Sequence, residues 1–150
     1  MDSLAWIATG TGVGTVVNGS IAAWIAYQQY TLGQRQHTHE LYEKRFAVFK
    51  ATQKFLSTAL LEGKLEYPDV FQFRPSLQDS NFLFDAPLTD YLEEIHKKSI
   101  EMIGASKKLL GADQNGLDKQ QLIETEHALL GWLIEQLPVL ITKFRPYLKV

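Results

Sequence analysis

The sequence predicts an all-α protein in which one amino-terminal transmembrane helix is followed by a small antiparallel helical bundle. No Asp, Glu, Lys, Arg or His occurs between Ser3 and Gln34. Apolar residues of the remaining chain recur at helical spacing, with Gly and Pro at the ends of the periodic stretches. We therefore expect a transmembrane anchor with its juxtamembrane segment over residues 1–34, and a cytoplasmic helical-bundle domain over residues 35–150.

The first expected element is a membrane span from Leu4 to Tyr27. At 1.5 Å per residue, the interval from Trp6 to Trp24 covers about 27 Å, which is close to the hydrocarbon thickness of a bilayer. Both tryptophans suit the two interfaces, and Tyr27 and Tyr30 extend the inner aromatic belt. A cleaved signal peptide is the alternative, but no basic residue precedes Leu4 and no clear small-x-small site precedes a mature start.

Charge on the two flanks of the span predicts its direction. The outer flank carries only Asp2, whereas five basic residues lie within the first stretch after Gln34: Arg35, Lys44, Arg45, Lys50 and Lys54. Cytoplasmic flanks carry the excess of Lys and Arg. The expected location is the bacterial inner (plasma) membrane, with the amino terminus outside and the carboxyl-terminal domain in the cytoplasm.

A row of small residues follows heptad spacing along the span. Because helices in lipid associate mainly through close van der Waals contact, such a row predicts a homo-oligomer with left-handed helix crossing. This oligomerisation seam consists of Ala5, Ala8, Gly12, Thr15, Gly19, Ala22 and Ala26.

A polar stripe lies beside the seam, formed by Thr11, Thr15 and Asn18. An isolated Asn at membrane depth is costly, so a partner helix or water is expected there. Three interpretations remain open: threonines that bond their own helix backbone, contacts between subunits, or the lining of an oligomeric pore.

The first domain helix continues from the membrane segment, and Gly63 is its expected end. Tyr67 to Phe84 reads as a short helix and an aromatic plug on the core. Pro87 suits the first turn of the next helix, whose heptad pattern runs from Leu88 to Gly111.

The last helix is expected after a loop over residues 112–116, with Asp118 as its N-cap. Leucines recur on one side of this helix, and Pro138 is expected to kink it. Aromatic and apolar residues from Phe144 to Leu148 close the chain.

Composition excludes several classes of function. The residues after Gln34 hold fifteen basic and sixteen acidic side chains, so nothing favours nucleic acid as a partner. The chain has no cysteine, which excludes disulfides, thiolate metal sites and a cysteine nucleophile.

Two E-x-x-H pairs are the best catalytic candidates: Glu93 with His96, and Glu124 with His127. Di-iron bundles use this spacing on two helices, with all ligands projecting inward. At 100° per residue, however, both pairs point well away from the expected core face. We therefore expect no catalytic residue, no metal and no cofactor.

Arg45 is expected to be structural. It lies in a run of basic and aromatic residues, Leu41 to Ala51. On an upright helix it would stand too far from the bilayer for contact with headgroups. An ion pair with an acidic residue of a neighbouring helix, such as Asp85, Asp90 or Glu94, is the preferred prediction.

That run resembles the L-Y-x-K-R-[FY]-x-V-[FY] helix of a family of small, uncharacterised bacterial single-pass membrane proteins. The upstream Ala-Tyr-Gln-Gln-Tyr, the later 82–85 segment and the 126–133 segment extend the resemblance over nearly the whole chain. The resemblance implies an amino-terminal span, a compact helical domain and bacterial origin, and it carries no catalytic residues.

The expected function is a membrane-anchored, self-associating, non-catalytic interaction or regulatory module. Membrane lipid, further copies of the chain and an unidentified protein are its expected partners. A pore-forming or membrane-perturbing effector, of the phage-defence or toxin type, is the first alternative. A metal-dependent helical-bundle enzyme that uses the E-x-x-H pairs is the second.

Overall fold

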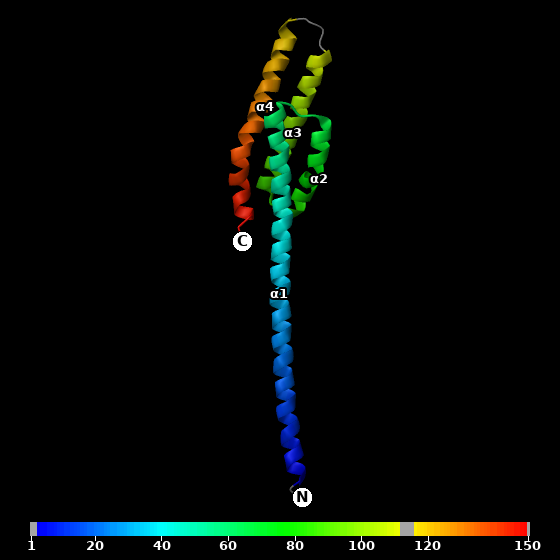
Figure 1. Ribbon diagram of the computed structural model, residues 1–150, viewed down its shortest axis with the longest axis vertical. Coiled ribbons are helices and arrows are strands. Elements are labelled where there is room, and N and C mark those ends of the chain that lie inside the picture. Colours follow the sequence, from blue (N-terminus) through cyan, green and yellow to red (C-terminus); the bar gives the residue numbers. More distant parts are fainter. Residues whose placement is uncertain (1–2, 112–115, 150) are drawn as a thin grey trace. The chain divides into compact units, whose positions relative to one another are not determined.

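The computed structural model describes the backbone of residues 3–111 and 116–149, and the side chains of residues 21–111 and 118–149. Four α-helices and a final 3₁₀ turn account for the described elements: α1 Ser3–Glu62, α2 Tyr67–Leu83, α3 Ala86–Gly111, α4 Gly116–Phe144 and η1 Arg145–Tyr147 (Figure 1). The described chain is all-α, as predicted from the sequence.

The chain divides into two compact units, residues 1–40 and residues 41–150. The first unit is helical from Ser3 onward, and helix α1 continues into the second unit as its first helix. Sequence reasoning places the corresponding boundary after Gln34.

The second unit is a bundle in which α1, α2, α3 and α4 alternate in direction along the chain (Figure 1). Its core combines one face of each helix. Leu56, Leu92, Ile95 and Leu133 are fully buried, as is Phe144. The heptad pattern predicted for α3 is confirmed over most of its length. Its first five heptad positions are buried: Leu88, Leu92, Ile95, Ser99 and Met102.

Helix ends coincide with the local signals in the sequence. Gly63 adopts a positive φ of 64°, and its N–H donates to the Ala59 carbonyl at 3.0 Å. A residue without Cβ takes this left-handed conformation without strain, so α1 ends where the sequence predicts. At the start of α2, the Glu66 N–H donates to the Asp69 carboxylate at 2.9 Å.

One predicted helix end is wrong. Helix α4 begins at Gly116, so Asp118 lies in its first turn and is not the N-cap. A carboxylate is favourable at either place, because both positions lie near the positive end of the helix dipole. Helix α4 also continues through Pro138 to Phe144, and residues 112–115 of the predicted loop lie outside the described residues.

Buried hydroxyl groups of the bundle are mostly satisfied within their own helices. Thr52 Oγ1 donates to the Val48 carbonyl at 2.8 Å, and Ser99 Oγ donates to the Ile95 carbonyl at 2.6 Å. Ser80 Oγ does the same to the Leu77 carbonyl, at 2.6 Å. Such bonds remove the cost of burying a hydroxyl without linking one helix to another.

Candidate functional site

Arg45 of α1 forms the main polar link at one end of the bundle. Its Nε donates to the Leu83 carbonyl at 3.0 Å, and its Nη1 reaches the Tyr147 carbonyl at 3.5 Å. Leu83 is the last residue of α2, and Tyr147 is the last residue of η1. Carbonyls at helix ends have no partner within the helix, so a single guanidinium satisfies two of them and ties both ends to α1.

Aromatic rings enclose this guanidinium. The Arg45 Cζ atom lies 5.8 Å from the ring centroid of Phe84 and 5.8 Å from that of Tyr147. Phe84 meets both Tyr147 and the buried Phe144 edge to face, at centroid distances of 5.4 and 5.3 Å. Planar guanidinium groups favour such ring faces, and a lysine could not make the same contacts.

Asp85 joins the Arg45 cluster through Tyr147. The Tyr147 hydroxyl donates to an Asp85 carboxylate oxygen. This bond, followed by partial desolvation, raises the pKa of Tyr147 above its usual value, while Arg45 acts in the opposite direction. The acceptors of Arg45 thus differ from the predicted ion pair: they are main-chain carbonyls, and within the described residues no ion pair joins Arg45 to Asp85, Asp90 or Glu94.

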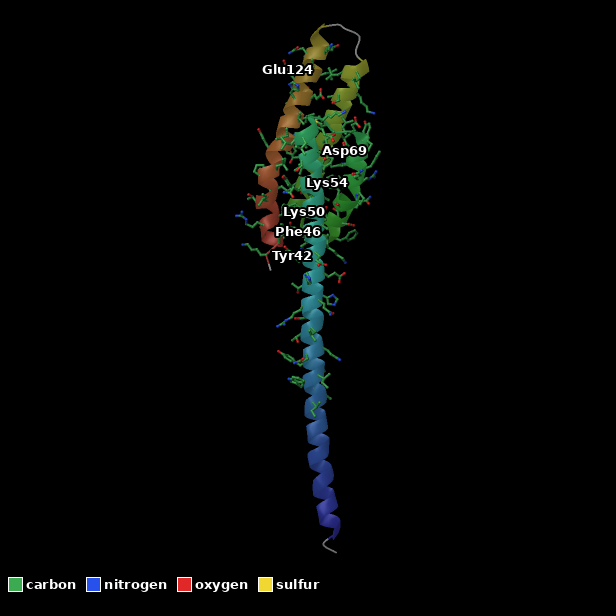
Figure 2. The ribbon with its side chains drawn as sticks, in the orientation of Figure 1. Tyr42, Phe46, Lys50, Lys54, Asp69 and Glu124 are labelled. Atoms are coloured by element: carbon green, nitrogen blue, oxygen red, sulfur yellow. The ribbon has the colours of Figure 1, made fainter. Side chains whose placement is uncertain are left out.

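The predicted basic and aromatic run forms a ladder on α1 (Figure 2). Tyr42 and Phe46 stack at 5.9 Å between centroids, and Phe46 stacks on Phe49 at 5.9 Å. The Lys50 ammonium lies 5.7 Å from the Phe46 centroid. Val48 and Phe49 face the core, whereas Phe46 is exposed, so the run belongs to both surface and core.

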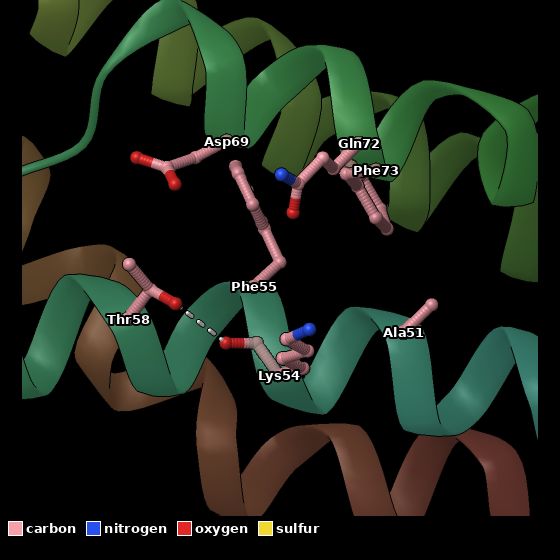
Figure 3. Close-up of a pocket in the computed structure, with 7 residues that line it drawn as sticks. All are labelled: Ala51, Lys54, Phe55, Thr58, Asp69, Gln72 and Phe73. Atoms are coloured by element: carbon pink, nitrogen blue, oxygen red, sulfur yellow. Dashed lines mark hydrogen bonds between the residues drawn. The ribbon is translucent and has the colours of Figure 1, made fainter.

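Two hollows lie between α1 and α2. Figure 3 shows the first, of about 190 Å³, where Lys54 and Thr58 of α1 lie opposite Asp69 and Gln72 of α2. Thr58 Oγ1 donates a hydrogen bond to the Lys54 carbonyl at 3.0 Å. The second, of about 340 Å³, has Phe82 at its edge. The first is smaller than most small-molecule sites, and the second lies near the lower limit of their range.

The E-x-x-H residues lie on the outside of the bundle. Glu93, Glu124 and His127 are exposed, and His96 is partly exposed. Among the described residues, no group of three or more His, Asp or Glu side chains is arranged to hold a metal ion.

Most of the seam and the polar stripe lies outside the described side chains. This holds for Ala5, Ala8, Gly12, Thr15 and Gly19 of the seam. It also holds for the stripe residues Thr11 and Asn18. The described seam residues, Ala22 and Ala26, are exposed on α1.

Apolar side chains beyond the seam are also exposed in the first unit. Trp24, Tyr27 and Tyr30 are 62, 67 and 64% exposed. Over the part of the chain with described side chains, no helix has both the length and the apolar character required to cross a membrane.

Tyr91 is the buried polar group that sequence reasoning missed. Its hydroxyl is the one buried side-chain polar atom without a hydrogen-bond partner in the described part of the bundle. Burial, with a smaller contribution from the Glu94 carboxylate, raises the pKa of Tyr91 to about 12. Heptad spacing marks the neighbouring Leu88 and Leu92 as core positions but gives no sign that a tyrosine beside them lacks a partner.

Comparison with protein-family models, with curated proteins and with solved structures gives no match for this chain.

Replacing Arg45 with Lys should lower the free energy of unfolding by about 1–3 kcal/mol, because an ammonium cannot satisfy two separated carbonyls and lie against two rings. Chemical denaturation of the full-length chain in non-ionic detergent, followed by circular dichroism, measures the change. The matched control is Arg74→Lys on the exposed side of α2, which should stay within about 0.5 kcal/mol of the parent. Equal losses in both variants would contradict this role of Arg45.

Replacing Tyr91 with Phe removes a hydroxyl that has no partner, so the stability near pH 7 should be unchanged or higher by about 1 kcal/mol. The raised pKa adds a pH dependence. The folded state holds the Tyr91 proton more tightly than the unfolded state, so the parent loses stability as the pH rises from about 10 to about 12. The variant should lose less over this interval, as measured by denaturant titration at several pH values. Parallel pH profiles would show that Tyr91 does not titrate in this way.

Proposed function

We propose that this chain is a membrane-anchored, self-associating interaction or regulatory module that acts by binding and not by catalysis. The carrying observation is the charge-free stretch from Ser3 to Gln34. Every charged or histidine side chain carries a large cost in hydrocarbon, so a stretch of this length without any of them fits insertion in a bilayer.

Exposure in the first unit supports an apolar environment around it. Ile21, Ile25 and Leu32 are 51, 45 and 53% exposed, beside the aromatic side chains already described. Apolar residues gathered on one short helical stretch need a partner that removes them from water, and lipid or a second helix would do so.

The direction of insertion follows from the charges. The only charged residue before Arg35 is Asp2, and the basic residues start with Arg35. By the positive-inside rule, the proposal places the amino terminus outside the bacterial inner membrane and the bundle in the cytoplasm. The likeness to small bacterial single-pass proteins agrees with this arrangement.

A binding role suits the bundle better than catalysis. Its two E-x-x-H pairs lie on an exposed surface, where metal ligands of helical bundles do not project. Its strongest polar cluster, around Arg45, joins helix ends and offers no open reactive group. An unidentified cytoplasmic protein is the proposed partner of the bundle.

Membrane insertion can be tested by fractionation with protease protection. The full-length protein should remain with bacterial inner membranes after carbonate extraction, and a carboxyl-terminal epitope should be digested only when the cytoplasmic side is exposed. A matched variant with Val17 and Ile21 replaced by Lys should fail to insert. Recovery of the parent as a freely soluble protein, or a periplasmic epitope, would overturn the proposal.

Self-association through the seam can be tested separately. Gly12→Leu with Gly19→Leu should reduce the oligomer in mild detergent, because bulky side chains keep the helix backbones apart. The control, Gly10→Leu with Gly14→Leu, adds the same bulk on the opposite side of the helix. Light scattering with detergent correction reports the mass. An unchanged mass in the Gly12→Leu, Gly19→Leu variant, or an equal loss of mass in the control, would rule out the seam as the interface.

A further inference from the structure

The largest of the described hollows lies beside the α1–α2 connection and has a volume of about 540 Å³. Leu65 and Ile103 form an apolar floor, with exposed fractions of 3 and 2%. Leu110 stands at the edge with 89% of its surface exposed. This volume lies in the range of small-molecule sites, which combine apolar walls with a few polar groups.

The basic side chains of this cavity already have partners. Lys64 Nζ is bonded to a Glu66 carboxylate oxygen at 3.2 Å. Lys107 Nζ lies 4.4 Å from the ring centroid of Tyr67 and faces its π system. The Lys64 charge is therefore paired with a carboxylate, whereas the Lys107 ammonium lies against a ring that attracts it but carries no charge.

The remaining charge, on Glu126, is matched only by a neutral group. Ser106 Oγ donates to Glu126 Oε1 at 2.6 Å across the α3–α4 contact. No ion pair of Glu126 occurs among the described residues. The formal charges of the lining cancel, since it holds two lysines and two glutamates, but Glu126 and Ser106 form an end of the cavity that offers only acceptors and carries an unpaired carboxylate.

The hydrogen-bonding groups at the Glu126 end of the cavity require a ligand that donates hydrogen bonds. The Ser106 hydroxyl donates its hydrogen bond to Glu126, so towards a ligand its oxygen can act only as an acceptor. The Glu126 carboxylate accepts and never donates when ionised. A ligand that meets both groups must bring N–H or O–H bonds of its own, and a positive charge would also neutralise the carboxylate.

We propose that this cavity is a binding site for an amphipathic organic cation, with an ammonium head at Glu126 and Ser106 and an apolar body over Leu65, Ile103 and Leu110. Binding would also cover Leu110, whose apolar side chain is otherwise in water. The site is independent of membrane insertion and of the seam, so either proposal can fail without the other.

Three probes of one shape test the chemistry: phenylbutylamine, phenylbutanol and phenylbutanoate. Calorimetric titration of the full-length chain in non-ionic detergent should give the highest affinity for the amine. Glu126→Gln should weaken amine binding by about ten- to a hundredfold, the range for a lost charge-assisted bond, and should change the alcohol little. Partition of the amine into micelles is the same for all variants and cancels in the comparison.

Glu124→Gln is the matched control, because Glu124 lies on the same helix outside the cavity and is exposed (Figure 2). It should bind the amine like the parent. Leu110→Ala should weaken amine and alcohol alike, and its exposed position makes it safe for folding. Tighter binding of the carboxylate than of the amine, or equal amine affinity in Glu126→Gln and Glu124→Gln, would overturn the proposal.

Discussion

One guanidinium closes the end of the bundle where several chain segments meet. Arg45 of α1 donates hydrogen bonds to two carbonyls, one at the end of α2 and one at the end of η1. A helix end inside a packed aromatic cluster has little access to water, so its carbonyls need a donor from elsewhere in the chain. The last residues of the protein are held to α1 by this contact and by the rings of Phe84 and Phe144.

Two hydrogen-bonded contacts between segments of the described bundle lie towards its two ends. The Arg45 cluster occupies one end, and the Ser106–Glu126 bond joins α3 to α4 towards the other (Figure 1). The buried hydroxyls between them bond to carbonyls of their own helices. Apolar packing is tolerant of small shifts, whereas a hydrogen bond between helices is not. These two contacts therefore help to fix the register of the helices that they join.

Helix ends were readable in the sequence because their causes are local. Gly63 ends α1 because only a residue without Cβ easily takes its positive φ, and Pro87 lies in the first turn of α3, where its missing N–H costs nothing. Asp118 misled the prediction because a carboxylate stabilises the first helical turn from more than one position.

Contacts that arise only in the assembled fold could not be predicted from local sequence signals. The acceptors of Arg45 are main-chain carbonyls, which every residue carries, so side-chain identity pointed instead to acidic partners. Glu126 and Ser106 are twenty positions apart and belong to no common motif, so their bond follows only from the packing of α3 on α4. The lone hydroxyl of Tyr91 is equally invisible before the core is assembled.

Exposed apolar residues have different meanings in the two units. In the bundle, Leu61, Phe71, Phe82 and Leu110 are exposed and are spread over three helices, as isolated apolar residues on protein surfaces commonly are. In the first unit, apolar and aromatic side chains gather between Ile21 and Leu32 on one continuous helical stretch. Water would make such a concentration unfavourable, and no charged side chain occurs within it to offset the cost. The contrast between scattered and gathered exposure is thus the physical ground for proposing an apolar surrounding for the first unit.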